Sequence, residues 1–146
     1  MSNRTLISFT ALVILGMAIL LGLNMNQILT GQPESQTYLN YNEVRGMAIS
    51  HHQLLYTLNF TQQNKVIGLL NKAVRIAELK ATERQPPDFD HLVIYQFNHK
   101  PDLIIKPIAY VDQNLIFSVP EWYKDGYLME LSEGDLQQLL SQTYDP

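Results

Sequence analysis

The chain has 146 residues, 46% of them hydrophobic, with 10 basic and 14 acidic side chains and a formal net charge of −4 at pH 7. This acidic balance argues against a nucleic-acid partner, because binding to phosphate backbones needs a basic footprint. The chain contains no cysteine, which excludes a disulfide, a thiol nucleophile and a lipid-modified cysteine.

Residues 6–23 form the first hydrophobic run and carry no charged side chain. A helix of 18 to 20 such residues is roughly 30 Å long, which matches the hydrocarbon thickness of a bilayer. A cleaved signal peptide is the alternative, but its apolar core is normally about 7 to 15 residues and ends at an Ala-x-Ala-like site. Residues 24–31, Asn-Met-Asn-Gln-Ile-Leu-Thr-Gly, offer no pair of small residues at that spacing. The sequence therefore predicts an uncleaved single-pass signal-anchor.

The orientation of this transmembrane helix follows from its flanking charges. Arg4 precedes the run, and no Lys or Arg follows it until Arg45. Basic flanks favour the cytoplasmic side, so residues 1–5 are expected in the cytoplasm. Residues 24–42 are rich in Asn, Gln, Thr and Ser and predict a polar linker. Residues 43–146 are then expected to form one extracytoplasmic domain.

The first half of that domain begins with two short apolar runs, Val44–Ser50 and Leu54–Phe60, which predict two strands joined by a turn. A helix is expected over Thr61–Ala73, because apolar residues recur there at helical spacing. Asn59 or Thr61 can cap this helix. The segment Val74–Leu79 predicts either a returning strand or an extension of the helix.

The second half of the domain reads as a meander followed by a helix. Strands are expected over Leu92–Phe97, Leu103–Val111 and Leu115–Val119. Pro107 cannot donate to a sheet ladder, so it predicts an edge or a bulge. Asp125-Gly126 is typical of a type I′ hairpin turn, and Ser132 is expected to cap a last helix over Ser132–Gln142.

Together these elements predict the α+β class: a small, mostly antiparallel sheet of five or more strands, with two helices on one face.

One candidate metal site combines carboxylates and imidazoles from a predicted loop. Asp88, Asp90, His91 and His99 offer oxygen and nitrogen ligands to a divalent ion, provided that the fold draws them together. The short spacing alone does not show such convergence, and a metal here is the weaker expectation. The adjacent His51 and His52 would point to opposite faces of a strand, so a solvated turn suits them better.

A candidate binding surface lies beside the predicted Asp-Gly turn. Trp122, Tyr123 and Tyr127 are aromatic residues of the kind enriched at binding hot spots. Packing in the core or across strands is the competing interpretation, because aromatic side chains also stabilise sheets.

Catalytic and cofactor motifs are missing from the sequence. No Gly-x-Ser-x-Gly elbow and no glycine-rich phosphate loop occurs, so no cofactor is expected. The leading hypothesis is a non-enzymatic, membrane-anchored interaction or assembly module with a protein partner in the membrane or envelope. A small-ligand or metal-binding sensor domain is the alternative, and a metal-assisted hydrolase using the same Asp and His residues is a third.

Overall fold

The computed structural model describes residues 13–15, 37–76, 78–79 and 84–146. The chain divides into two compact units, Met1–Glu34 and Ser35–Pro146, and the fold described below is that of the second unit. Most of the predicted anchor at 6–23 and of the linker at 24–42 lies outside the described residues. Within the described residues, no helix is long and apolar enough to cross a membrane.

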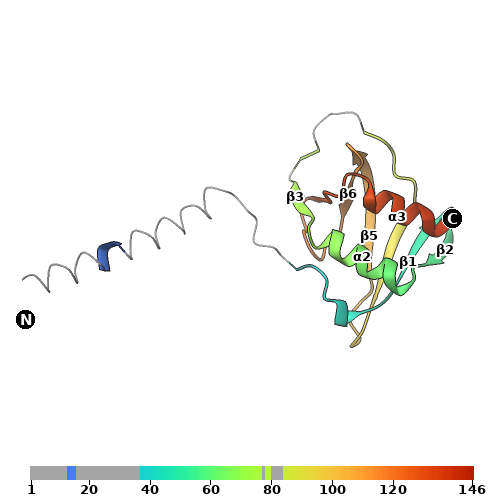
Figure 1. Cartoon of the computed structure of the whole chain (residues 1–146). Helices are drawn as coiled ribbons and strands as arrows, with labels where there is room; N and C mark the ends of the chain where they lie inside the picture. Colours follow the sequence, from blue (N-terminus) through green and yellow to red (C-terminus); the bar gives the residue numbers. More distant parts are fainter. Residues whose placement is uncertain (1–12, 16–36, 77, 80–83) are drawn as a thin grey trace, which may run out of the picture. The chain divides into compact units, whose positions relative to one another are not determined.

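A seven-stranded sheet with only antiparallel pairings forms the body of the second unit (Figure 1). Its strand order is β2-β1-β4-β5-β6-β7-β3, and the antiparallel sheet expected from the sequence is confirmed. The strands are β1 (Val44–His51), β2 (Leu54–Thr57), β3 (Val74–Ile76), β4 (His91–Gln96), β5 (Leu103–Val111), β6 (Asn114–Ser118) and β7 (Tyr127–Met129). The segment after the first helix is thus a strand, and it forms one edge of the sheet beside β7.

Two-residue turns with positive φ join two of the strand pairs. His52 and Gln53 connect β1 to β2 with φ of 50° and 67°, and Asp112 and Gln113 connect β5 to β6 with φ of 49° and 65°. Positive φ at both central residues is the signature of the type I′ turn, whose twist matches that of the paired strands.

The type I′ hairpin predicted at Asp125-Gly126 is wrong. Neither residue has a positive φ, and β7 pairs with β6 and β3 instead of with a strand just before it. At position 126 the ring of Tyr123 occupies the space that a Cβ would take, so any larger residue there would require that ring to move. The glycine therefore marks a close approach of a side chain and not a hairpin.

Pro107 lies in β5, a strand between β4 and β6, but the pairing with β4 ends at Ile105, so Pro107 has a ladder partner on the β6 side only. The expected bulge is found, because the register between β5 and β6 shifts between Pro107 and Ala109. A bulge at this position accommodates the missing N–H of proline inside a sheet.

Helix α2 (Phe60–Leu70) follows a 3-10 turn, η1 (Tyr41–Glu43), and the first two strands. Its N-cap is Asn59, whose side chain accepts from the Gln62 N–H at 2.9 Å, while the Gln62 side chain accepts from the Asn59 N–H at 2.8 Å. This reciprocal capping box satisfies two backbone donors, and it confirms Asn59 as the helix-entry residue.

Helix α3 (Asp135–Tyr144) begins three residues later than the sequence predicted. Its N-cap is Gly134, at a φ of 105° that a residue with a Cβ rarely adopts. Ser132 nevertheless satisfies a first-turn donor, because its Oγ accepts from the Leu136 N–H at 3.0 Å. The loop Ser132–Gly134 thus performs the capping that was expected of Ser132 alone.

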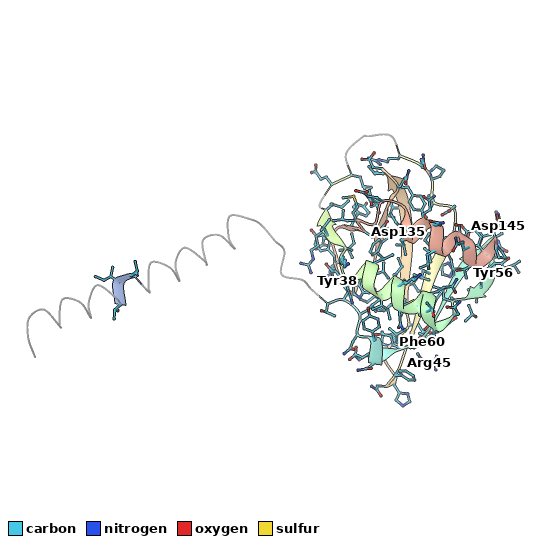
Figure 2. The ribbon with its side chains drawn as sticks, viewed as in Figure 1. Tyr38, Arg45, Tyr56, Phe60, Asp135 and Asp145 are labelled. Carbon is cyan, nitrogen blue, oxygen red and sulfur yellow. The ribbon has the colours of Figure 1, made fainter. Side chains whose placement is uncertain are left out.

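Both helices lie on the same face of the sheet, as Figure 1 shows. The core fills the space between the two layers, and residues of both helices and of the sheet are buried in it. The buried side chains of this core include Val66, Ile67 and Leu70 of α2, Leu136 and Leu140 of α3, and Met47, Ile49, Leu92, Ile94, Ile105, Leu115, Phe117 and Leu128 of the sheet. Figure 2 marks the start of α2 with Phe60 and the two ends of α3 with Asp135 and Asp145.

Candidate binding groove between the two helices

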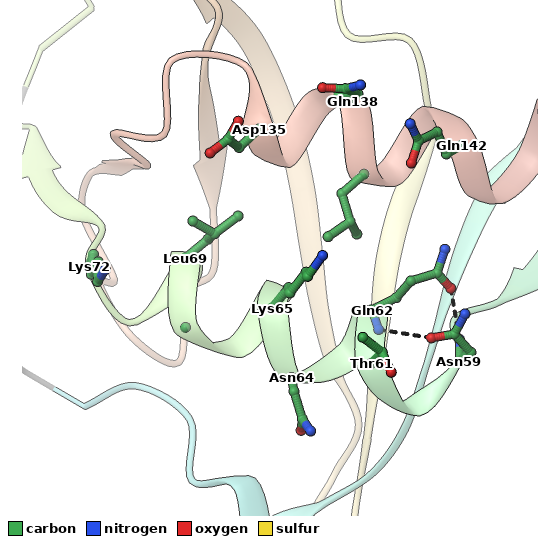
Figure 3. A pocket seen from close by; sticks show the side chains of 12 residues that line it. Asn59, Thr61, Gln62, Asn64, Lys65, Leu69, Lys72, Asp135, Gln138 and Gln142 are labelled. Atoms are coloured by element: carbon green, nitrogen blue, oxygen red, sulfur yellow. Dashed lines mark hydrogen bonds between the residues drawn. The ribbon is translucent and has the colours of Figure 1, made fainter.

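A groove of about 610 Å³ runs between α2 and α3 on the side of the helices away from the sheet core (Figure 3). The helices are antiparallel, because Gln62 in the first turn of α2 donates from Nε2 to Oγ1 of Thr143 in the last turn of α3 at 3.3 Å. The groove is lined by Asn59, Thr61, Gln62, Asn64, Lys65, Gly68, Leu69 and Lys72 from the α2 side and by Asp135, Gln138, Leu139 and Gln142 from α3.

Helical periodicity explains why these residues line one groove. On α3, positions 135, 138, 139 and 142 follow the i, i+3, i+4, i+7 spacing, so they share one face of the helix. On α2, positions 61, 64, 65 and 68 do the same. Leu136 and Leu140, one position further along α3 than Asp135 and Leu139, turn into the core instead.

The groove combines an apolar base with amide walls. Leu69 and Leu139 are half-buried and pack against the hydrophobic core, so they form its base. The walls carry the amide side chains of Asn59, Gln62, Gln138 and Gln142, whereas Asn64 borders the groove with its side chain pointing away from α3 (Figure 3). Gln62 uses both groups of its amide within the protein, whereas Gln138 and Gln142 each present a donor and an acceptor that can bond to both kinds of polar group on a ligand.

The charges of the groove are divided between its two walls. Lys65 and Lys72 are exposed on the α2 side, and Asp135 is exposed at the start of α3. The structure has one ion pair within its described part, Lys100 with Glu43, so none of these three groups is paired there. At the Lys72 end the groove adjoins a hollow of about 410 Å³, which Asp135 and Glu133 also line.

The predicted aromatic surface is largely engaged by its own domain. Trp122 is half-buried and stacks on Tyr38, with ring centroids 4.9 Å apart, and its edge meets Phe117 at 6.4 Å. The guanidinium of Arg75 lies 5.1 Å from the ring centroid of Tyr123. Trp122 and Tyr123 both pack against the hydrophobic core, which favours the packing interpretation for these two residues.

The third aromatic residue of the predicted surface, Tyr127, is on β7 and is half-buried. Its register partner is Ile76 of the edge strand β3. The structure therefore spreads the three predicted residues over a loop and a strand.

Three of the four predicted metal ligands are near one another in the sequence, and one lies apart. Asp88, Asp90 and His91 are consecutive or nearly so before and at the start of β4, while His99 lies in the turn beyond the other end of that strand. No group of three His, Asp or Glu side chains in the described residues is placed to hold a metal ion.

The two aspartates of this set bind protein groups. Asp88 Oδ1 accepts from the Tyr110 hydroxyl at 2.8 Å. Asp90 Oδ2 accepts from the Gln53 N–H and the Ser50 hydroxyl, each at 3.0 Å. These bonds hold the pKa of Asp90 below its ordinary value, the Gln53 bond having the largest effect and the Ser50 bond the next. Both carboxylates therefore tie the loop before β4 to its neighbours.

A cluster at the β1–β2 turn joins residues that are far apart in the sequence. Neither the His51-His52 pair nor the Asp88–His91 segment predicts it alone. The His51 ring stacks on Tyr144, the last residue of α3, with centroids 4.0 Å apart, and the His51 Nδ1 lies 2.8 Å from the Asp88 carbonyl oxygen. Burial, and then the nearby Asp88 carboxylate, raise the pKa of the Tyr144 hydroxyl. The cluster fastens the end of α3, and hence one wall of the groove, to the sheet.

Comparison of the chain with protein-family models, with curated proteins and with solved structures finds no match.

Proposed function

We propose that this chain is a non-enzymatic interaction or assembly module, and that a protein partner of the membrane or envelope binds in the groove between α2 and α3. In this proposal the segment 6–23 anchors the chain in the membrane, and the domain at 43–146 lies outside the cytoplasm. The linker at 24–42 gives the domain reach as far as Tyr38, which packs on the domain. The observation that carries the proposal is the groove itself, with its leucine base and amide walls.

Amide side chains suit recognition better than reaction. Asn and Gln donate and accept hydrogen bonds but do not exchange protons near neutral pH, whereas general acid-base catalysis needs groups that do. The titratable groups of the groove are Lys65, Lys72 and Asp135, which are all exposed to solvent. Solvent-exposed charges of this kind steer and orient a partner.

The base of the groove supplies the apolar part of the binding energy. Leu69 and Leu139 are half-buried in the free chain, so a partner that covers them removes further apolar area from water. An apolar centre surrounded by polar groups is the usual anatomy of a protein interface.

Photo-crosslinking in native membranes tests this proposal. A photoreactive residue in place of Gln138 faces the groove, and one in place of Asp102, which is exposed before β5, serves as the control. We expect a crosslinked product of the full-length chain from position 138 and not from position 102. Equal crosslinking at both positions, or none at position 138, would refute the groove as the binding site.

A further inference from the structure

We infer that the ligand of the groove is an extended peptide segment of about five residues that carries an acidic side chain opposite Lys65. This inference names the chemistry of the partner and rests on the proposed function. It combines the length of the groove, its amide walls and the position of Lys65.

The length of the groove sets the length of the segment. Helix α2 has 11 residues, and at about 1.5 Å per residue it is roughly 16 Å long. An extended chain rises about 3.3 Å per residue, so about five residues run the length of the groove.

The amide walls favour an extended segment over a helical one. A helix satisfies its own backbone N–H and C=O groups, whereas an extended chain leaves them free for the side chains of Asn59, Gln138 and Gln142.

The charge preference follows from the neighbours of the two lysines. Lys72 shares its end of the groove with Asp135 and Glu133, whose negative charges offset it. Lys65 lies about two turns before Lys72 on α2 and does not line the hollow that Asp135 and Glu133 share with Lys72, so these carboxylates offset its charge less. A carboxylate on the ligand therefore complements Lys65 best, and a basic side chain there would meet a like charge.

Peptide binding to the full-length chain in detergent micelles tests the inference. The probes are Ac-Ala-Thr-Glu-Thr-Ala-NH2 and the same peptide with Lys in place of Glu, and the readout is the set of side-chain amide NMR signals of Gln138 and Gln142. We expect the Glu peptide to shift these signals and to bind about fivefold tighter than the Lys peptide, as a solvent-exposed ion pair allows. The variant Lys65→Glu should reverse that order, whereas the control Lys124→Glu, on the exposed loop before β7, should preserve it.

Two outcomes would overturn the inference. One is an equal affinity for both peptides, and the other is a full set of shifts from Ac-Glu-NH2 alone, which would identify a small anion as the ligand. If Gln138 crosslinks a partner in membranes while neither peptide shifts the groove signals, the extended acidic segment is wrong and the proposed function stands. If the crosslink is also missing, both fail.

Discussion

At the scale of single residues, Glu130 stands out because it is an acidic side chain that is fully buried. Its Oε1 accepts from the Leu115 N–H and its Oε2 from the Ser132 N–H, each at 2.8 Å. Burying a carboxylate is costly unless hydrogen bonds replace its water. Glu130 therefore joins β6 to the loop that leads into α3, and so helps to place one wall of the groove.

The variant Glu130→Gln tests this role. Glutamine has one acceptor oxygen, so its NH2 group would face one of the two backbone N–H donors and leave it without a partner. We expect a loss of about 1 to 3 kcal/mol in the free energy of unfolding, measured by chemical denaturation. The same change at the exposed Glu121 is the control and should have almost no effect. A loss of equal size at both positions would contradict the role of Glu130.

We expect Asp90 to make a contribution to the stability of the fold that is lost in acid. Its pKa is held below the ordinary value of 3.8 by the Gln53 N–H and the Ser50 hydroxyl, so the folded state favours the carboxylate. A carboxylate whose pKa is lower in the folded than in the unfolded state stabilises the fold at pH values above the unfolded-state pKa. This stabilisation is lost as the pH falls through the folded-state pKa. Melting temperatures measured from pH 6 down to about pH 2.5 should fall less steeply for Asp90→Asn than for the natural chain. Parallel curves would show that Asp90 does not contribute.

At the scale of elements, helix α2 depends on the stripe that it packs on the sheet. Leu70 is fully buried in that stripe, whereas Thr61 is exposed in the first turn. An aspartate at position 70 would be a buried, unpaired charge, costing about 4 kcal/mol or more, enough to unfold a domain with little stability to spare. Circular dichroism should therefore show an unfolded Leu70→Asp variant beside a folded Thr61→Asp control. A folded Leu70→Asp variant would mean that the buried face of α2 is assigned wrongly.

The sequence predicted the bounds of helices and strands better than it predicted which strands pair with each other. The bounds of β5 and the Asn59 cap followed from apolar runs and from side-chain hydrogen bonding, which act within a few residues. The pairing of β3 with β7 joins segments about 50 residues apart, and the alternation of residues in a strand does not identify its neighbour. The prediction of a type I′ turn at Gly126 failed for the same reason. The backbone conformation there depends on the packing of Tyr123 and the pairing of β7, which involve residues outside the turn.

The groove was missed because its polar residues resemble an ordinary solvent-facing stripe. The helical spacing of the apolar residues leaves Gln62 and Lys65 on the opposite face, which is the solvent-exposed face of an isolated amphipathic helix. Only the antiparallel placement of α3, with Gln138 and Gln142 at the spacing of one turn, turns two exposed stripes into facing walls. The spacing in α3 was a signal in the sequence, but the distance between the helices was not.

At the scale of the whole molecule, the proposed anchor at 6–23 makes a prediction about placement. Fractionation should recover the full-length chain with membranes, and protease added to sealed spheroplasts should degrade the domain at 43–146. The cytoplasmic residues 1–5 leave almost no protected fragment beyond the anchor itself. Full-length chain in the soluble fraction would contradict the anchor, and a domain that is protected until the membrane is lysed would contradict the orientation.

The most direct test of the central claim uses the natural absence of cysteine, because any cysteine introduced is then the only thiol in the chain. Single-cysteine variants at Gln138 in the groove and at Asp102 outside it are alkylated with a maleimide, first in native membranes and then after purification. If a partner fills the groove at about ten times its Kd, the cysteine at position 138 should react about tenfold more slowly in membranes than in the purified chain. The cysteine at position 102 should react equally fast in both. Equal rates at position 138 in membranes and in the purified chain would contradict the account of the groove as a partner-binding site.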